Sequence, residues 1–209
     1  LMEIKKFEYT AILGWSSTRY DIFSECKRKY YYQYYAKFDK EFQRDRINFL
    51  KGLTSIPMEI GNISHDVLKE VLERLKKSTV PIDKQKFEDY VKNISQASTE
   101  KNFFEVHYKV QERIDAEQLF PKTFASLNNF LESERFGWIK GSAISEMDKW
   151  IIEPEGYGES RLDGLKLYCK VDFMFPSGEK IIILDWKTGK KNESKHSKQL
   201  VGYAAWASF

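Results

Sequence analysis

The first part of the chain repeats its apolar residues with the period of a helix. Between residues 63 and 77 apolar side chains recur every three or four positions, as in a helix with one buried face. Before this segment, the helix-breaking residues Gly52, Pro57 and Gly61 interrupt any helical pattern. The spacing predicts helices at 18–36, 63–77 and 121–136, and two exposed helices within 83–118.

After Gly137 the pattern changes to short β-rich runs separated by turn residues. The runs 143–154, 165–176 and 180–186 are predicted strands, and "PSGE" at 176–179 joins the last two as a hairpin. Helical spacing returns from residue 194 onward. This order predicts an α/β (α+β) fold, with a mixed central sheet flanked by helices and a helical N-terminal half.

The composition narrows the class of protein. The chain has 209 residues, 42% apolar and 31% charged, which suits one domain with a real core. Its net charge of +3 is too small to argue for a nucleic-acid partner. The two cysteines, Cys26 and Cys169, are far apart and have no metal-ligand spacing. So few isolated cysteines favour a reducing compartment, and we expect a cytoplasmic location. No apolar run is long enough to span a membrane, and the N-terminus does not read as a signal peptide.

The most hydrophobic predicted strand ends in two opposite charges. Residues 181–184 run directly into Asp185, and Lys187 follows on the same face of the strand. If the hairpin forms, Asp172 of the preceding strand can lie beside Asp185. Two adjacent carboxylates repel unless a cation lies between them, and Mg²⁺ or Mn²⁺ prefers oxygen ligands. Taken alone, Asp185 and Lys187 are also consistent with a surface ion pair.

These residues resemble the motif of the PD-(D/E)XK nuclease superfamily. There an Asp on one strand, here Asp172, is followed at the end of the next strand by (D/E)-x-K, here "DWK" at 185–187. The run "LDWKTGK" followed by "KQLVGYA" is similar to the RecB-like branch, which includes the CRISPR-associated exonucleases. That branch has a D-x-K-T-G turn and a Q-x-x-x-Y helix, matched by Gln199 and Tyr203. "GNISH" also matches its G-x-x-x-H pattern, with His65 as the histidine.

The resemblance covers 143–209 closely and 16–36 and 57–75 loosely, and it leaves 78–136 without a motif. It implies a restriction-endonuclease-like fold and metal-dependent hydrolysis of phosphodiester bonds in DNA. The implied enzyme is a deoxyribonuclease, most simply an exonuclease that acts in DNA processing or repair.

The resemblance also assigns roles to residues. It implies that the metal, Mg²⁺ or Mn²⁺, is bound by His65, Asp172, Asp185 and the main-chain carbonyl of Trp186. Lys187 would act on the attacking water.

Three further groups complete the expected site. Glu146, on the first predicted strand, is expected to be catalytic, although it could instead orient a water or face solvent. Gln199 and Tyr203 share one helix face and are expected near the DNA backbone. Lys190 and Lys191 are expected to bind DNA as well, although their basic run at 187–198 also fits a solvated loop.

Some relatives hold an iron–sulfur cluster with one N-terminal cysteine and three later ones. Cys26 has the place of the first, before a basic and aromatic run, but the chain lacks the other three. A cluster needs about four thiolates, so we expect none in this chain. Because the sequence stops inside a predicted helix, we expect the native protein to continue past Phe209.

We predict a single nuclease domain over 1–209, helical over about 1–137, with the catalytic sheet and helix over about 138–209. Its expected partners are DNA and a helicase or other repair or recombination subunits, and no membrane. Two alternatives remain open: a non-catalytic DNA-binding module of a helicase–nuclease assembly, and a CRISPR-adaptation exonuclease whose longer chain holds a cluster. The aromatic run at 26–40 fits either a clamp for a single strand or a buried helix.

Overall fold

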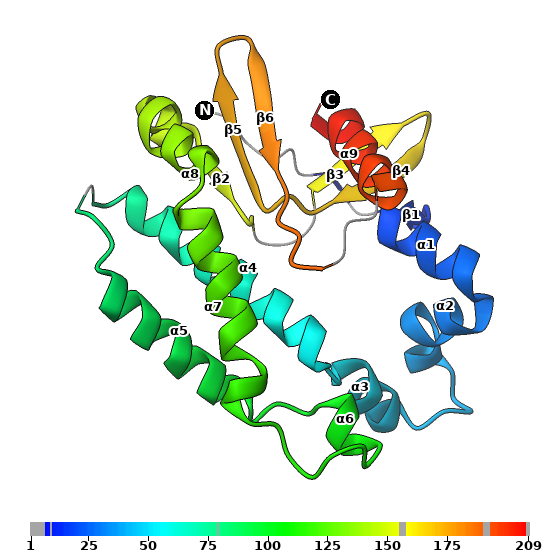
Figure 1. The fold of residues 1–209 in the computed structure, drawn as a ribbon. Helices are drawn as coiled ribbons and strands as arrows, with labels where there is room; N and C mark the ends of the chain where they lie inside the picture. The colour runs from blue at the N-terminus through cyan, green and yellow to red at the C-terminus, as the bar shows by residue number, and fades with distance from the viewer. Residues whose placement is uncertain (1–6, 9, 79, 155–157, 190–192, 208–209) are drawn as a thin grey trace. The chain divides into compact units, whose positions relative to one another are not determined.

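The computed structural model describes residues 7–8, 10–78, 80–154, 158–189 and 193–207. It combines helices with two small sheets of three strands each (Figure 1), which confirms the predicted mixed α+β class. No helix in these ranges is both long and apolar enough to cross a bilayer.

The chain forms two compact units by its internal contacts. The first unit contains Leu53–Glu153 and Asp172–Lys191, and the second contains Glu3–Gly52, Pro154–Val171 and Asn192–Phe209. The single nuclease domain over 1–209 stays a prediction.

Among the described residues of the first unit, three α-helices are long and two are short. Helix α4 (Ile56–Leu75), α5 (Lys84–Ser98) and α7 (Phe120–Leu131) pack against one another, as Figure 1 shows. The short helices are α6 (Phe104–His107) and α8 (Glu134–Trp138). A 3₁₀ turn over Ala116–Gln118 precedes α7.

Helix α4 begins earlier than its sequence pattern indicates. Ser55 is the N-cap, and its side chain accepts a hydrogen bond from the Met58 amide over 3.4 Å. Pro57 lies in the first turn, where a backbone N–H has no acceptor within the helix. Proline therefore costs no hydrogen bond there and is compatible with the start of the helix. Gly61 lies within the helix. The predicted interruption at these positions was therefore wrong.

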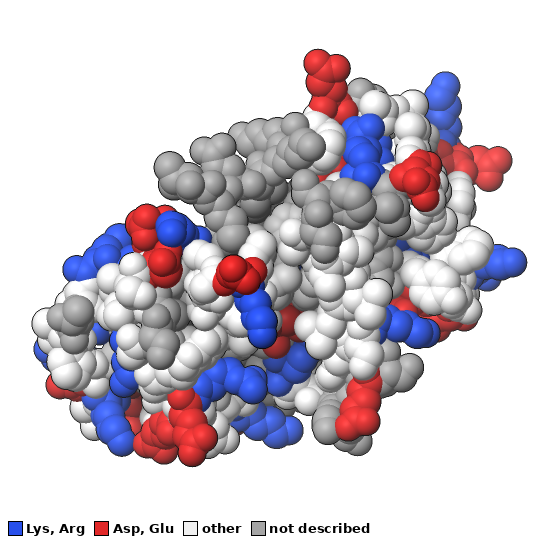
Figure 2. Space-filling model, turned by 90° about the horizontal axis from the view of Figure 1, so that it is seen from above, with Lys and Arg blue, Asp and Glu red and all other residues white. Residues whose placement is uncertain are grey.

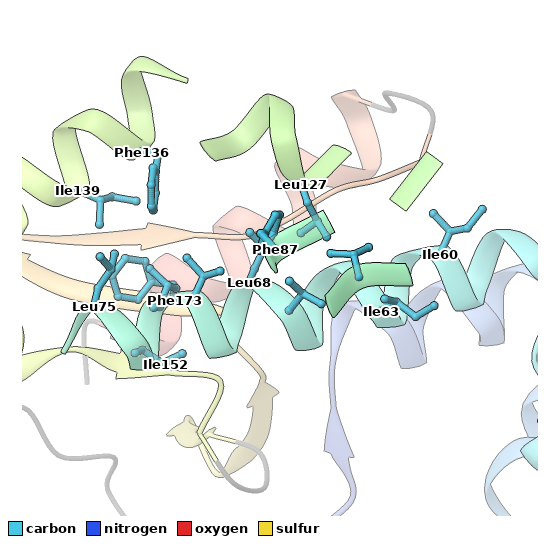
Figure 3. Packing of buried hydrophobic residues seen from close by; sticks show 14 of the residues in the cluster. Ile60, Ile63, Leu68, Leu75, Phe87, Leu127, Phe136, Ile139, Ile152 and Phe173 are labelled. Atoms are coloured by element: carbon cyan, nitrogen blue, oxygen red, sulfur yellow. The ribbon is translucent and has the colours of Figure 1, made fainter. Parts of the chain in front are cut away.

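The apolar face of α4 forms the centre of the core in the first unit. Figure 3 shows Ile60, Ile63, Leu68 and Leu75 of this helix among buried side chains of the other helices and the sheet. Phe173 of the sheet is fully buried in the same cluster. This packing fixes the position of α4 against the strand that follows Asp172.

The sheet of the first unit has the order β2-β5-β6 and is antiparallel. Strand β5 (Phe173–Ser177) and β6 (Lys180–Leu184) form the predicted hairpin. Gly178 takes a φ of +60° in its turn, a conformation that glycine adopts without steric penalty. The edge strand β2 is only Ile151–Ile152.

The predicted strand over 143–154 was wrong for most of its length. Ile139–Ala143 forms a π-helical turn, and Ile144–Lys149 is a 3₁₀ segment with a kink at Glu146. Ile144, Met147 and Trp150 recur every third residue and are at least partly buried, which is the period of a 3₁₀ helix.

In the described part of the second unit, the strands form the sheet β1-β4-β3 and four α-helices accompany it. The strands are β1 (Gly14–Trp15), β3 (Gly158–Leu162) and β4 (Leu165–Cys169). The helices are α1 (Ser17–Glu25), α2 (Lys27–Tyr34), α3 (Arg44–Gly52) and α9 (Glu193–Ala207), with a 3₁₀ turn over Ala36–Phe38.

Two predicted elements are divided in the structure. The helix predicted at 18–36 breaks at Cys26, whose backbone is extended and whose sulfur accepts a hydrogen bond from the Lys29 amide over 3.4 Å. The strand predicted at 165–176 is β4 and β5, in two different sheets. Within the run 26–40 only Tyr30 and Ala36 of the described residues are buried, which excludes a buried tyrosine-rich helix.

Candidate active site

Two carboxylates face each other at the base of the β5–β6 hairpin. Phe173 pairs with Leu184 in the ladder, so Asp172, just before β5, and Asp185, just after β6, occupy the next facing positions. Their side chains are 13% and 10% exposed. The hairpin thus brings together the two carboxylates that the sequence pattern singled out, although Asp172 lies just before its strand and not within it.

The Asp172 carboxylate is held from two sides. The main-chain N–H of Trp186 donates a hydrogen bond to its Oδ2 over 2.7 Å. Its Oδ1 lies 3.3 Å from Nδ1 of His65, on α4. Asp172 therefore joins the α4 helix to the turn that carries Asp185.

His65 is positioned by the buried face of α4 and is partly exposed at the site, with 30% of its side chain accessible. Burial lowers the pKa of His65, but the hydrogen bond and charge of Asp172, together with the charge of Asp185, outweigh burial. The pKa of His65 is therefore raised above its ordinary value. The charges of both carboxylates therefore favour the protonated form of the imidazole.

Lys187 forms an ion pair with Asp185, the carboxylate two residues before it. The Lys187 side chain is 37% exposed, so its ammonium group lies at the edge of the site. The structure therefore brings four sequence-predicted residues into one cluster: His65, Asp172, Asp185 and Lys187.

A close approach between α4 and the turn after β6 fixes this cluster. A Cβ added at Gly61 would lie 3.3 Å from Oγ1 of Thr188, which is tighter than an ordinary van der Waals contact. The glycine of the "GNISH" segment thus lets the helix of His65 approach the turn of Lys187.

A cleft of about 880 Å³ opens beside the cluster within the first unit. Asp185, Trp186, Lys187 and Thr188 line it together with residues of α4, α7 and α8. The Trp186 ring packs edge to face on Phe130 of α7, with 4.9 Å between ring centroids. The candidate catalytic groups therefore border a space large enough for a small organic ligand.

The donor types of the cluster suit a hard divalent cation. Two carboxylates and an imidazole can bind Mn²⁺ or Mg²⁺ when the imidazole is neutral. Among the described residues no three histidine, cysteine or acidic side chains already form a metal cage. His65 is bonded to Asp172, and Asp185 to Lys187. The donor chemistry fits such an ion, and His65, Asp172 and Asp185 are the residues that would hold it.

Glu146 does not lie on a strand, so that prediction was wrong. It lies at a kink within the 3₁₀ segment Ile144–Lys149, where its own backbone is not helical, and it forms an ion pair of 2.5 Å with Lys149. This pair ties Glu146 to its own turn. The catalytic role expected for Glu146 has no support from this placement.

Gln199 and Tyr203 lie on α9 of the second unit. Gln199 Nε2 donates to the Tyr203 hydroxyl over 2.5 Å, and that hydroxyl donates to the Lys170 carbonyl over 2.9 Å. Both side chains line a cleft of about 690 Å³ with Arg19 and Lys170. The Q-x-x-x-Y pair is thus hydrogen-bonded within this cleft. Lys190 and Lys191 lie outside the described residues.

The structure adds cleft residues that the sequence reasoning missed. Ser126, Asn129, Arg135 and Trp138 of the α7–α8 segment line the cleft that also contains Asp185 and Lys187. This segment lies in the part of the sequence without a motif or at its end. The spacing of the polar residues on the predicted helix at 121–136 was the only available signal.

A comparison with protein families identifies the chain. The matching family model, described as the PD-(D/E)XK nuclease superfamily, covers residues 14–208. Members of this superfamily are generally nucleases and typically use divalent metal ions. No curated protein and no solved structure gave a match. Because the family model spans nearly the whole sequence, the chain belongs to the PD-(D/E)XK nuclease superfamily.

Proposed function

We propose that the protein is a divalent-metal-dependent deoxyribonuclease, most simply a RecB-like exonuclease that hydrolyses phosphodiester bonds during DNA processing or repair. The observation that carries this proposal is the cluster at the base of the β5–β6 hairpin. There Asp172 bonds to His65, and Asp185 pairs with Lys187 beside an open cleft.

The residues of the cluster would have different roles in catalysis. When bound, Mg²⁺ or Mn²⁺ supplies positive charge to the phosphate and makes water at the site more acidic. Asp172, Asp185 and His65 would hold the ion. The Lys187 ammonium, already at the cleft, can orient the attacking water or donate to a phosphate oxygen as negative charge develops on it. The hydrogen bond from the Trp186 amide keeps Asp172 in place for this role.

DNA is the substrate that these groups suit best. Gln199, Tyr203, Arg19 and Lys170 offer donors and charge that can bind phosphate oxygens without reading sequence. Figure 2 shows Lys and Arg mixed with Asp and Glu among the described residues on the face seen from above. DNA binding would therefore depend on individual side chains near the site and not on a broad positive surface. A helicase or repair subunit as partner, and a cytoplasmic location, belong to the same proposal.

The test is degradation of end-labelled linear DNA by the purified protein with Mg²⁺, Mn²⁺ or EDTA. We expect cleavage with either metal and none with EDTA. Lys187→Ala should lose at least about 100-fold in rate, as expected for a group that stabilises developing charge. Lys180→Ala, at the exposed far end of β6, is the matched control and should cleave like the wild type. An inactive wild type, or equal rates for the two variants, would contradict the proposal.

One observation favours a second candidate, a non-catalytic DNA-binding module. His65 and Lys187 already pair with the two carboxylates, and the described residues contain no ready-made metal cage. Calorimetry with Mn²⁺ separates the two functions. Binding that Asp172→Asn and Asp185→Asn both abolish supports the nuclease, whereas no binding by the wild type supports the module.

A further inference from the structure

We infer that the cleft beside the cluster binds a single strand of DNA, with Arg135 contacting a phosphate and Trp138 stacking on an unpaired base. The inference rests on the proposed nuclease function, because it gives that site a substrate form. Both residues lie in the α8 helix, which borders the same cleft as Asp185 and Lys187.

The polar face of α7 is turned to this cleft. Ser126, Asn129 and Phe130 follow the helical spacing of three and four, so they share a face, and all three line the cleft. Leu127, which also lines the cleft, and Thr123 are buried. Hydroxyl and amide groups that line a cleft can donate hydrogen bonds to phosphate or to base edges.

Arg135 supplies the positive charge of this segment. Its side chain is exposed, and no carboxylate partner for it is found among the described residues. The adjacent Glu134 also lines the cleft, but neighbours in sequence do not face each other on a helix. A guanidinium that is not engaged by a carboxylate can bind two phosphate oxygens at once.

Aromatic rings supply the surface that an unpaired base needs. Trp138 is 36% exposed, and its ring packs at 5.4 Å from Phe175, which fixes its orientation. Phe130 and Trp186 form a second aromatic pair in the same cleft. Bases within a duplex are already stacked on one another, so rings inside a cleft select single strands.

The size of the cleft agrees with this assignment. About 880 Å³ is within the range of pockets that enclose one small organic ligand, roughly 300–1,000 Å³. Such a space suits a short stretch of one strand. The phosphate that enters it would lie between Arg135 of α8 and Lys187 of the turn, both of which line the cleft.

Binding of fluorescein-labelled oligothymidylate, followed by anisotropy in EDTA, tests the inference. The full wild-type chain is the reference protein, and no strand is cut because EDTA removes the divalent metal. Adding Arg135→Gln should weaken binding about tenfold and reduce the salt slope by about 0.7. Adding Trp138→Ala should weaken binding by about fivefold or more, and Trp138→Phe by less, because phenylalanine keeps a stacking surface. Arg113→Gln, an exposed arginine paired with Asp115, is the control and should bind normally.

Three results would overturn the inference. The first is equal binding of the oligomer by the Arg135→Gln and Arg113→Gln proteins. The second is that Trp138→Ala weakens the binding of duplex DNA as much as the binding of single strands. The third is that thymidine monophosphate binds as tightly as the oligomer. Thermal unfolding checks that each variant folds. If Trp138→Ala does not fold, Arg135→Gln and Trp138→Phe still decide the question. Absence of cleavage by the wild type would contradict the nuclease proposal and leave this binding assay readable.

Discussion

The main-chain N–H of Trp186 donates a hydrogen bond to the Asp172 carboxylate over 2.7 Å. This bond attaches the turn that carries Asp185 and Lys187 to Asp172, the residue just before strand β5. Asp172 therefore has two separable roles, one as an acceptor that holds the turn and one as a negative charge in the site.

Two substitutions of Asp172 separate these roles. Asp172→Asn keeps an oxygen that accepts from Trp186 but removes the charge, so at about pH 8, where the charge pairing with His65 contributes least, we expect nearly normal stability and at least about a 100-fold loss of nuclease rate. Asp172→Ala also leaves the Trp186 N–H without its acceptor and should destabilise the fold by about 1–3 kcal/mol. Urea unfolding and DNA cleavage measure the two effects. Equal stability of the two variants would show that the hydrogen bond does not hold the turn.

The contact between Gly61 and Thr188 makes a second prediction. Alanine in place of a helical glycine stabilises a helix by about 1 kcal/mol, but here the new methyl group would press on Oγ1 of Thr188 at 3.3 Å. We expect Gly61→Ala to keep or raise the melting temperature and to lower the cleavage rate about tenfold by displacing the Lys187 turn.

The double variant Gly61→Ala/Thr188→Ala tests the cause. Removing the Thr188 hydroxyl relieves the contact, so the rate should recover relative to Gly61→Ala alone, as a double-mutant cycle would show. Gly52→Ala is the control, because a Cβ there meets nothing within 4 Å. A lost rate that the second substitution does not restore would rule out this contact as the cause.

The sequence pattern predicted the hairpin and its two carboxylates because both depend on local signals. Two short apolar, β-rich runs, a four-residue turn between them and two acidic residues suffice to place Asp172 beside Asp185. His65 could be linked to them only through the family resemblance, since nothing local indicates which strand the α4 helix approaches. The hydrogen bond of 3.3 Å is a product of tertiary packing.

The errors have a common physical origin. Short apolar runs do not distinguish strands from 3₁₀ turns, so Glu146 was predicted on a strand where the structure has a kinked 3₁₀ segment. The division of 165–176 between two sheets depends on partners distant in sequence, which periodicity cannot reveal. The same limit applies to Arg135 and Trp138, whose cleft is formed by three separate parts of the chain.

His65 gives the metal-free protein a defined pH dependence. Its pKa in the folded state is raised by the hydrogen bond and charge of Asp172 and the charge of Asp185, against the effect of burial. The folded state therefore binds this proton more tightly than the unfolded state does, whose histidine pKa is about 6.5. The resulting stability is fully present below the unfolded pKa and is lost as the pH rises through the folded pKa.

Urea unfolding in EDTA at about pH 6 and about pH 8 measures this contribution. We expect the free energy of unfolding of the wild type to fall between these values by more than that of His65→Gln. The other histidines are unchanged in the variant, so the difference between the two proteins isolates His65. Identical pH dependence would mean that His65 and Asp172 do not interact in solution.

The fully buried Glu59 anchors the first turn of α4, the helix that carries His65. Its carboxylate accepts hydrogen bonds from Asn62 over 3.1 Å and from Thr54 over 3.2 Å, and pairs with Lys101 over 2.5 Å. Burial raises the pKa of Glu59, but the bonds from Lys101 and Asn62, among others, outweigh it and hold this pKa below its usual value. Its stabilisation is therefore present above the unfolded pKa, about 4.3, and lost as the pH falls through the folded pKa.

Lys101→Met should therefore destabilise the protein by about 1–3 kcal/mol at neutral pH, since it leaves a buried carboxylate without its cation. The matched control is Lys84→Met, which breaks the exposed pair with Glu132 at 3.0 Å and should leave stability unchanged. Urea unfolding of the three proteins at neutral pH makes the comparison. If the Lys101 and Lys84 variants are equally stable, the buried pair does not anchor α4. A cleavage rate that falls with Lys101→Met but not with Lys84→Met would show that this anchor also positions His65.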